Sequence, residues 1–498
     1  MLISGLRCIM SHDLIIHKPR ETIMKVIGRK AEIKELGYYA ETKKSELVCV
    51  YGRRRVGKTF LVEQTFGEYF AFRATGLENG KTRDQLKAFN ARLIKHGCKN
   101  KTIPINWFEA FSRLEEVLYG AETTVSPTGK KIVFFDELPW FDTARSDFML
   151  AFEEFWNRCG TQHGDLLFII CGSATSWIID NVINDTGSLY HRTTAQIFVK
   201  PFTLHETEQF FKDREFDWSR EQITEFQMVF GGLPYFMDLL NINESFRQNI
   251  DRLMFRQGAL LRNEASRLLE ATLRKSPIYS DILELLSKHR YGLKRTECQG
   301  TLNVSGSSFT RALDNLIKCG YVIEYTRNYE HRNPLYIQLI DPFLLFHFHF
   351  LSKGEKQLTS YDDLSSDIGR YNDWRGTAFE MLCLIHAGQI KKALGIAGVK
   401  TDVFPWNCTE KNKKAQIDIV IERADNITNL CELKYTDEPY KMTDEADQAL
   451  IKKRDMFKEM TETKQSLRIV LISAHGLSGT AHTEHISEVI TLDDLFEG

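Results

Sequence analysis

Short, almost uninterrupted apolar runs mark the strands of the first two hundred residues. The runs are ELVCV ahead of Gly52, IVFF ahead of Asp136 and LLFIIC ahead of Gly172. A strand reads in this way when helices cover both faces of a parallel sheet, because neither face then meets water. Between these runs the chain has room for further β–α units, so residues 24–205 are predicted to form an α/β domain around a parallel sheet.

The pattern becomes helical after residue 205 and changes again near residue 277. Residues 206–275 have helical spacing, which predicts a helical lid over the sheet. Residues 276–345 read as a helix, a short helix, a turn, a helix and two alternating runs joined by a polar loop. This is the order of a winged helix-turn-helix, which can place a helix in a DNA major groove. Contact with DNA is one alternative and a packing role is the other.

Three arginines of this segment, Arg311, Arg327 and Arg332, are the residues that would contact DNA. The run PFLLFHFHFL that follows (342–351) is expected to be buried, with His347 and His349 as structural residues rather than metal ligands.

Two alternating strands near residues 416–435 carry charged residues at matched positions. Asp418 lies on one face of the first strand, together with Gln416 and Val420, and the intervening isoleucines lie on the other face. Glu432 and Lys434 share one face of the second strand by the same rule. If the strands pair as a hairpin, Asp418, Glu432 and Lys434 converge. A helix that begins near residue 374 precedes them and carries an acid, Glu380.

Composition limits the classes of protein that fit. A chain of 498 residues is long enough for two to four domains, and a net charge of −2 gives no global field that would favour nucleic acid. No apolar run approaches the roughly 18 residues of a membrane span. The ten cysteines form no CxxC pair, so we expect a cytoplasmic protein without structural disulfides. Residues 1–23 show no secretory signal, and a disordered lead segment and an over-long start of the chain are the two alternatives for them.

A phosphate-binding loop follows the first apolar run. The sequence GRRRVGKT has the spacing GxxxxGK[ST] between a strand and an amphipathic helix. In such a loop the backbone N–H groups surround the phosphates, Lys58 reaches the β and γ oxygens, and the hydroxyl of Thr59 binds Mg²⁺. The predicted nucleotide contacts from this loop are Gly52, Arg53, Arg54, Arg55, Val56, Gly57, Lys58, Thr59 and Phe60.

Acidic and small polar residues at the ends of the next strands complete the expected site. Asp136 would share Mg²⁺ with Thr59, and Glu137 would prepare the attacking water. Ser173 stands where a γ-phosphate could be sensed. Arg192 lies between the third strand and the next, where an arginine can stabilise transition-state charge in cis or from a neighbouring subunit; a surface ion pair is the alternative for Arg192.

The order GRRRVGKT, FFDE, CGSATS, LYHR and FGGLPYF resembles the AAA+-related signal-transduction ATPases with numerous domains (STAND). More narrowly, it resembles the archaeal-type ATPases of archaea and bacteria. The resemblance covers residues 24–345 and implies that ATP is the nucleotide. It also implies that Arg29, in VIGRKAEIKEL, approaches the nucleotide and that Pro234, in GGLPY, packs near the adenine.

The pattern ID…ELK resembles the PD-(D/E)XK nucleases of the restriction-endonuclease-like superfamily, with Ile417 where that family usually has proline. Two carboxylates can bind a divalent cation through oxygen, which polarises a phosphate and generates hydroxide. The predicted ligands for Mg²⁺ or Mn²⁺ are Asp418, Glu432 and Glu380, and Lys434 would position or activate the water. Three lysines of the preceding turn, Lys411, Lys413 and Lys414, give the site a basic approach.

Residues 346–498 are therefore expected to form a nuclease-like α/β domain. We expect an ATP-binding and ATP-hydrolysing protein that acts on or near DNA, with a protein partner or a homo-oligomer as further possibilities. The alternative is a STAND-type regulatory switch whose last domain binds partners without cleaving. A chaperone-like ATPase acting on protein is the third possibility.

Overall fold

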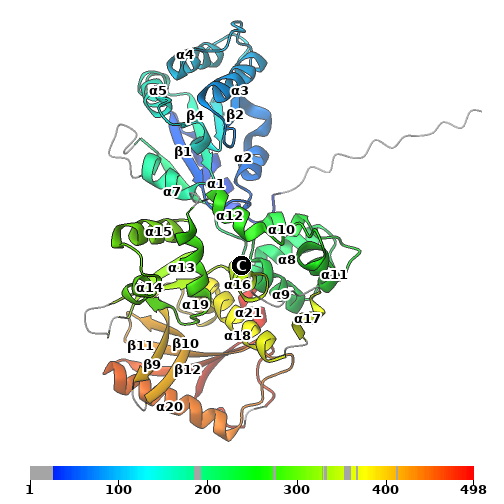
Figure 1. Cartoon of the computed structure of the whole chain (residues 1–498), viewed down its shortest axis with the longest axis vertical. Coiled ribbons are helices and arrows are strands. Elements are labelled where there is room, and N and C mark those ends of the chain that lie inside the picture. Colours follow the sequence, from blue (N-terminus) through cyan, green and yellow to red (C-terminus); the bar gives the residue numbers. More distant parts are fainter. Residues whose placement is uncertain are drawn as a thin grey trace, which may run out of the picture.

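The computed structural model describes most of the chain. The described residues are 26–183, 192–272, 276–327, 329, 334–352, 360–365, 368–410, 413–479 and 481–498. The predicted lead segment 1–23 lies outside them, as does Arg332. Three groups of elements are arranged along the longest axis of the molecule (Figure 1). The blue and cyan elements lie at the top, the green ones in the middle and the orange strands at the bottom, while the yellow helices and the C-terminus lie beside the middle group.

The first group is built on a parallel sheet of five strands. Its strands are β1 (Glu46–Tyr51), β2 (Phe70–Thr75), β3 (Lys131–Asp136), β4 (Leu166–Gly172) and β5 (Ala195–Phe198). They lie in the order β2-β3-β4-β1-β5, and every pair is parallel. The three apolar runs of the sequence are β1, β3 and β4, and all are buried. The predicted α/β fold with a P-loop type of parallel sheet is confirmed.

Helices cover both faces of this sheet. They are α1 (Lys30–Glu41), α2 (Lys58–Phe66), α3 (Thr82–Lys95), α4 (Trp107–Leu118), α5 (Phe148–Phe155), α6 (Thr161–His163) and α7 (Thr175–Ile178). Aromatic rings fill the space between α3, α4, α5 and the sheet, and Phe111 stacks on Phe135 with ring centroids 6.0 Å apart. Such rings bury large apolar areas, which anchors these helices to the strands that carry the polar loops.

The middle group is mostly helical. Its helices and strands are α8 (Leu204–Asp213), α9 (Arg220–Phe230), α10 (Pro234–Asp238), α11 (Phe246–Ile250), α12 (Glu264–Thr272), α13 (Pro277–Ser287), β6 (Leu293–Lys294), α14 (Arg295–Leu302), α15 (Gly306–Lys318), β7 (Val322–Thr326), β8 (Leu335–Leu339) and α16 (Pro342–Phe350). Helix α16 is the apolar run PFLLFHFHF, and it packs against α9, α13 and α18 (Ile368–Ile385). The predicted burial of this run is confirmed.

Elements α13 to β8 have the order expected from the sequence. Strands β7 and β8 pair antiparallel as the predicted hairpin, and β6 adds a third strand beside β8. Phe309, Leu313 and Leu316 lie together in the buried face of α15, as predicted. Arg311 is exposed, but the prediction that Arg327 contacts DNA is wrong. Arg327 is buried, lies over the ring of Tyr336 and donates a hydrogen bond to Asn407 Oδ1 over 3.0 Å.

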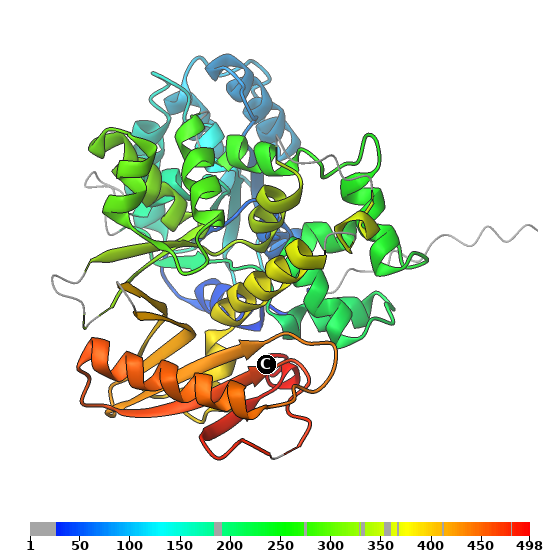
Figure 2. The same cartoon turned by 60° about the horizontal axis from the view of Figure 1, so that its bottom comes forward.

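The last group is a mixed sheet between helices. Its elements are α17 (Asp362–Ser365), α18, α19 (Ala387–Ala393), β9 (Thr401–Glu410), β10 (Lys413–Arg423), β11 (Ile427–Lys434), α20 (Asp444–Thr461), β12 (Ser466–Ser473), β13 (Ile486–Ile490) and α21 (Leu492–Leu495). The strand order is β13-β12-β11-β10-β9, and β10 and β11 form the antiparallel hairpin that the sequence predicts. Helix α20 lies along one face of the sheet, while α18 packs on β10 and β11 (Figure 2).

A β-bulge interrupts the alternation of β10. The register with β9 passes from Ile417↔Trp406 to Val420↔Phe404, so two residues of β10, one of them Asp418, oppose the single Pro405. Proline has no N–H for the ladder, and a bulge re-aims the side chains around it. The predicted faces of this strand are therefore wrong in part: Ile417 packs in one cluster with Val420 and Phe457, whereas Ile419 belongs to the main core.

Nine cysteines lie in the described part of the chain, and all nine are buried free thiols, as predicted. Among the helices that the structure describes, none combines the length and apolar character needed to cross a membrane.

A buried histidine ties the middle group to the last one. His386 follows α18, donates from Nδ1 to the carbonyl of Leu382 over 2.8 Å and accepts from the backbone N–H of Leu204 at Nε2 over 2.9 Å. Burial lowers its pKa to about 4. The ring therefore stays neutral in the folded protein at a pH where an unfolded histidine gains a proton.

The first prediction concerns acid stability. Between pH 6.5 and pH 4 only the unfolded state protonates His386, so the free energy of unfolding should fall as the pH falls, by about 3 kcal/mol at most. Urea unfolding measured across this range should show a weaker pH dependence for His386→Gln than for the wild type. His163→Gln, which changes an exposed histidine, should keep the wild-type slope. Equal slopes for His386→Gln and the wild type would contradict the assignment.

Candidate functional site

Glycines shape the loop between β1 and α2. Gly52 has φ 144°, and a Cβ at this position would lie 2.5 Å from the carbonyl oxygen of Val199, which is too close for any side chain. Gly57 has φ 91° and caps the N-terminus of α2. Both positions need glycine. The loop curves around the N-terminus of α2, where backbone N–H groups and the helix dipole favour the binding of an anion.

Lys58 and Thr59 begin α2 at the centre of this loop. Lys58 Nζ donates to the carbonyl oxygens of Gly52 and Arg53, 2.9 Å from each. Thr59 Oγ1 lies 3.1 Å from both carboxylate oxygens of Asp136, which ends β3. Burial, and then the neighbouring Glu137, raises the pKa of Asp136. A divalent cation between Thr59 and Asp136 would offset this cost, because it stabilises the ionised carboxylate.

Glu137 is held by the end of the neighbouring strand. Strand β4 lies between β1 and β3, so the residue after β4 stands between the loop and the acids. That residue is Ser173, whose N–H and hydroxyl donate to Glu137 Oε2 over 3.0 and 2.9 Å. Glu137 itself has left-handed backbone angles, φ 49° and ψ 52°. The carboxylate is thereby fixed at the carboxyl edge of the sheet, where ligands bind in open α/β folds.

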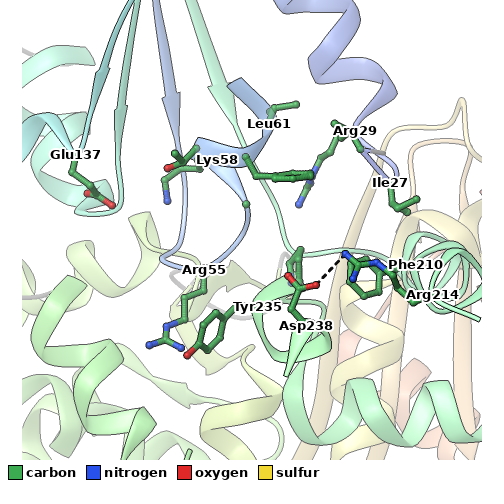
Figure 3. A pocket seen from close by; sticks show the side chains of 15 residues that line it. Ile27, Arg29, Arg55, Lys58, Leu61, Glu137, Phe210, Arg214, Tyr235 and Asp238 are labelled. Carbon is green, nitrogen blue, oxygen red and sulfur yellow. Dashed lines mark hydrogen bonds and ion pairs between the residues drawn. The ribbon is translucent and has the colours of Figure 1, made fainter. Parts of the chain in front are cut away.

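A cavity of about 320 Å³ opens beside these residues (Figure 3). Eight predicted residues line it: Arg29, Arg55, Gly57, Lys58, Thr59, Phe60, Glu137 and Pro234. The sequence analysis missed the other seven: Val26, Ile27, Leu61, Phe210, Arg214, Tyr235 and Asp238. These seven come from α2, α8 and the residue that follows it, α10 and the segment before α1. Five of them are apolar or aromatic, and Arg214 and Asp238 form an ion pair that the sequence did not indicate.

The cavity has a polar end and an apolar end. Lys58 and Glu137 stand at one end, and Ile27 and Phe210 stand at the other, near an ion pair of 3.3 Å between Arg214 and Asp238 (Figure 3). Its volume is at the lower end of the range for small-ligand sites. A phosphate chain on the loop would therefore leave its base among apolar side chains.

Arg29 closes one side of the loop. Its guanidinium donates to the carbonyl of Val56 over 3.2 Å and lies over the ring of Phe202. Burial lowers the pKa of this side chain, which is partly offset by Glu206 and Glu32. A phosphate would be a further partner for this buried charge.

The three arginines of the loop point to different parts of the molecule. Arg53 pairs with Asp341, the residue that caps α16, and its guanidinium lies over the ring of Tyr321. Arg54 lies 3.5 Å from Glu78, and Arg55 lies 3.0 Å from Glu264 and stacks on Tyr235. Arg53 is 5% exposed and absent from the cavity wall, so only its backbone is placed to contact a nucleotide. The place of Arg53 among the predicted nucleotide contacts therefore depends on its backbone and stays a prediction.

The remaining predicted residues lie around the cavity without lining it. They are Gly52, Arg54, Val56, Asp136 and Ser173. Arg192 is exposed on the turn before β5. Because Ala195 pairs with Val48 near the start of β1, this turn lies at the opposite end of the strands from the phosphate loop. The catalytic role of Arg192 stays a prediction.

Residues 27–240 match the family described as an ATPase domain predominantly from Archaea. The chain carries an archaeal-type ATPase domain. The match spans the phosphate loop, the acids after β3 and helix α10, so the residues that build the cavity all belong to this domain or directly precede it.

Individual proteins are similar to longer parts of the chain. The Uncharacterized protein MJECL04 of Methanocaldococcus jannaschii is 24% identical over 362 residues, 71% of this chain and 75% of that protein. The Walker-type ATPase PABY2304 of Pyrococcus abyssi is 19% identical with a TM-score of 0.49, covering 65% of this chain and 96% of its own. The ORC2 protein of Aeropyrum pernix is 13% identical with a TM-score of 0.40, and the match covers 65% of this chain and 93% of the ORC2 chain. The family match applies to residues 27–240 alone.

A second cluster of charged residues lies in the C-terminal sheet, outside the ATPase domain. Asp418 in β10 accepts the backbone N–H of Leu433 at Oδ2 over 2.9 Å, so its other oxygen is free to face the cluster. Burial and the neighbouring Glu432 raise the pKa of Asp418. Glu432 accepts Lys434 Nζ over 2.9 Å and Lys453 Nζ, from α20, over 2.6 Å. The convergence of Asp418, Glu432 and Lys434 therefore occurs, and Lys453 joins them.

The two lysines control the ionisation of Glu432. Burial works to raise the pKa of this carboxyl, but Lys434 and Lys453 outweigh it and hold the pKa below the usual range. Glu432 is thus the member of the pair with Asp418 whose ionised form is favoured, whereas burial disfavours the ionised form of Asp418.

Glu380 and Asp418 share a cation from the middle group. Glu380, on α18, pairs with Arg290, which lies in the turn after α13. Arg290 Nη2 also lies 3.2 Å from Asp418 Oδ1, and the hydroxyl of Tyr291 lies 3.4 Å from the same oxygen. Nothing in the sequence indicated that Arg290 or Tyr291 would enter this cluster, because more than ninety residues separate them from the acids of the C-terminal sheet.

A groove of about 630 Å³ is joined to the cluster through Tyr291 and Lys453, which line it and also contact Asp418 and Glu432, while the acids themselves do not line it. Its lining includes Lys414, Lys452 and Lys453. Of the three lysines expected before β10, Lys414 lines this groove, Lys411 lies outside the described residues, and nothing is described of the side chain of Lys413. The basic approach predicted for the site is therefore present through Lys414 and two lysines of α20.

The chemistry of the acid cluster fits a hard divalent cation in part. Carboxylate oxygens are the ligands of Mg²⁺ and Mn²⁺, and Asp418 and Glu432 carry them on neighbouring strands, Asp418 at the bulge of β10 and Glu432 near the end of β11. In the described structure, however, Glu380, Asp418 and Glu432 do not bring one oxygen each within 4.8 Å of one another. Arg290 lies between two of these acids. The donor set fits a metal, and the guanidinium occupies part of the space.

A different group of residues does bring its possible metal-ligand atoms within this distance. Glu115, Cys159 and His163 lie within 4.8 Å of one another in the described part of the chain. Glu115 pairs with Arg158, and burial raises the pKa of the Cys159 thiol to about 11. A neutral thiol is a poor metal ligand, so this group is better explained by packing.

The second prediction separates nucleotide binding from hydrolysis. Lys58→Ala should abolish the binding of ATP with Mg²⁺, because the phosphates lose their buried cation. Glu137→Gln should keep binding and slow hydrolysis by about 10²- to 10⁴-fold, because only the water-activating carboxylate is removed. Calorimetry measures the binding and phosphate release measures the turnover. Glu68→Gln, an exposed control, should behave as wild type, and normal turnover in Glu137→Gln would refute its role.

The third prediction concerns the Arg53–Asp341 pair. Asp341→Asn keeps a cap for α16 but leaves the Arg53 charge buried without a carboxylate, so the free energy of unfolding should fall by about 3 to 5 kcal/mol. Arg54→Ala removes a half-exposed pair in the same loop and should cost less than about 1 kcal/mol. Urea unfolding of both variants gives the comparison. Similar costs for the two would show that the buried pair is not what joins the loop to α16.

Proposed function

We propose that the chain binds and hydrolyses ATP and uses its nucleotide state to control a Mg²⁺- or Mn²⁺-dependent, nuclease-like site that acts on DNA. The observation that carries the proposal is the position of Asp418, Glu432 and Lys434 beside a groove lined by lysines, in a chain that also carries an ATPase domain. Three lysine charges along a groove suit a phosphate backbone, and the acids beside it suit the metal that would act on that backbone.

The ATPase domain supplies the residues for turnover. When Mg²⁺ is bound, it would neutralise phosphate charge, with Thr59 and Asp136 as its protein ligands. Lys58 would give up its two carbonyl partners for phosphate oxygens. Glu137 would orient and deprotonate water, with its carboxylate held by Ser173. Pro234 and Ile27 would pack against the base, and Arg192 would act in trans if copies of the chain assemble.

The division of the chain follows from the same proposal. The ATPase core would be residues 24–205, the lid 206–275, the winged helix-turn-helix 276–345 and the nuclease-like part 346–498. We assign the winged helix-turn-helix a connecting role, since it is bonded to both neighbours. Lys318 of α15 lies 2.5 Å from Asp180 in the first group, and Arg327 donates to Asn407 of β9. Arg311 remains the residue of this unit through which DNA could be contacted.

One observation favours a second candidate function. The three acids of the cluster face three cations, Arg290, Lys434 and Lys453, so their charges are balanced without a metal. A regulatory switch of the STAND type, in which the last part binds partners and does not cleave, would have such a balanced cluster. The two functions differ in whether DNA is cut.

The fourth prediction compares them directly. Wild-type protein with Mn²⁺ and ATP should nick supercoiled plasmid, and Asp418→Asn should lose this activity by about a hundredfold or more because one metal ligand is gone. Asp373→Asn, which changes an exposed acid on α18, should cut as wild type does. Gel electrophoresis of the plasmid measures the result.

Lys58→Ala separates the two halves of the proposal. Loss of cutting in Lys58→Ala would support control by ATP, and unchanged cutting would limit the proposal to the C-terminal site. ATP turnover by the wild type without any cutting would favour the switch.

A further inference from the structure

We propose that Arg290 is a built-in cation that occupies the acid cluster and competes with divalent metal, so that metal binds only when the turn carrying Arg290 withdraws. This inference rests on the proposed function of the cluster and names its regulation. In physical terms, the guanidinium is an internal inhibitor supplied by a different part of the fold.

The position of the guanidinium is the first argument. Arg290 pairs with Glu380 and lies 3.2 Å from Asp418 Oδ1, and these are two of the three oxygen donors available to a metal. The other oxygen of Asp418 is already engaged by the N–H of Leu433. The oxygen of Asp418 that does not accept this N–H is contacted by Arg290 and by the hydroxyl of Tyr291, so a metal at Asp418 would compete with both for it.

The second argument is charge. With Arg290 in place, the cluster is balanced, because each of its three acids faces a cation. Without Arg290, Lys434 and Lys453 still pair with Glu432, while Glu380 and Asp418 lose their shared cation. Asp418 and Glu380 are both buried, so two carboxylates without a cation would be costly there. A divalent ion is the compact charge that can replace the guanidinium.

The third argument is that the turn has its own attachments. The carbonyl of Arg290 accepts Gln338 Nε2 over 2.8 Å, and the carbonyl of Tyr291 accepts the hydroxyl of Tyr325 over 2.7 Å. Gly292 closes the turn with φ 70°, and a Cβ there would lie 2.7 Å from the carbonyl oxygen of Ile337. The turn is thus fixed to strands β7 and β8 as well as to the acids. Its place in the cluster therefore depends on how β7 and β8 lie against the C-terminal sheet, which they contact through Tyr325 and Phe404.

These strands also lead to the ATP site. Gln338 lies three residues before Asp341, the partner of Arg53 in the phosphate loop. A shift of β8 relative to the C-terminal sheet would withdraw Arg290 from Glu380 and Asp418. The elements bonded to the phosphate loop therefore hold the cation that blocks the second site.

The fifth prediction tests this by metal binding, independently of cleavage. Full-length protein is titrated with Mn²⁺ alone and free Mn²⁺ is read by electron paramagnetic resonance. The C-terminal site is the part of the binding that Asp418→Asn removes. Arg290→Met should tighten that part by about tenfold or more, because methionine fills similar space without competing for the oxygens. Arg311→Met, which changes an exposed arginine of the same unit, should leave it unchanged.

Two results would overturn the proposal in distinguishable ways. Binding that depends on Asp418 but has the same affinity in Arg290→Met and wild type would mean that the metal site exists and Arg290 does not block it. No Asp418-dependent Mn²⁺ binding in any variant would remove the metal site, and with it the proposed function.

A measurement on the wild type guards against an Arg290→Met variant that fails to fold. Saturating Mn²⁺ should raise amide hydrogen exchange across residues 288–294, because the bound ion expels Arg290 and frees the turn. The same addition to Asp418→Asn should leave the exchange of this segment unchanged. Asp418-dependent binding with no change in exchange would refute the blocking role.

Discussion

A buried charge needs a partner of opposite charge, and the pair between Arg53 and Asp341 meets this need by joining distant parts of the chain. Arg53 belongs to the phosphate loop and is almost fully buried, so its guanidinium needs a carboxylate inside the protein. Asp341 supplies it from the N-terminus of α16, 288 residues further along the chain. Helix α16 then packs on α9, α13 and α18. The position of the nucleotide loop is therefore coupled to helices of the middle and last groups.

The acid cluster meets the same requirement with the signs of the charges reversed. There the buried charges are negative, and the cations come from β11, from α20 and from the turn after α13. Lysine is a compact, flexible charge, whereas arginine presents a planar fork that can join two carboxylates. Arg290 is the only one of the three cations that two acids share in the described structure. It is also the one that another part of the fold holds in place.

The middle group is thus bonded both to the phosphate loop and to the acid cluster. One end of β8 leads to Asp341 and the phosphate loop, and its Gln338 is bonded to the turn of Arg290. A contiguous set of bonds of this kind can carry a coupling when one of its elements has two arrangements. Nucleotide binding could change the arrangement of the phosphate loop, because Lys58 is bonded to loop carbonyls that a phosphate would displace.

Much of this could be predicted from the sequence, because it depends on local pattern. The parallel strands, the glycine loop with Lys58 and Thr59, the acids after β3 and the hairpin of β10 and β11 all follow from apolar runs, alternation and fixed spacing. Such patterns determine which residues stand at the carboxyl edge of the sheet or on one face of a strand. They fail where the ladder is irregular, as at the bulge opposite Pro405.

What only the tertiary structure decided is the choice of partner for each long charged side chain. The sequence places Arg53 in a nucleotide loop, Arg327 near the end of a strand and Arg290 in a turn, and each reads as a surface or ligand-binding residue. In the fold Arg53 and Arg327 are buried, and Arg290 enters the acid cluster of a distant sheet. An arginine side chain is long and always charged, so its place depends on which acids the fold brings near it, and no local spacing encodes that.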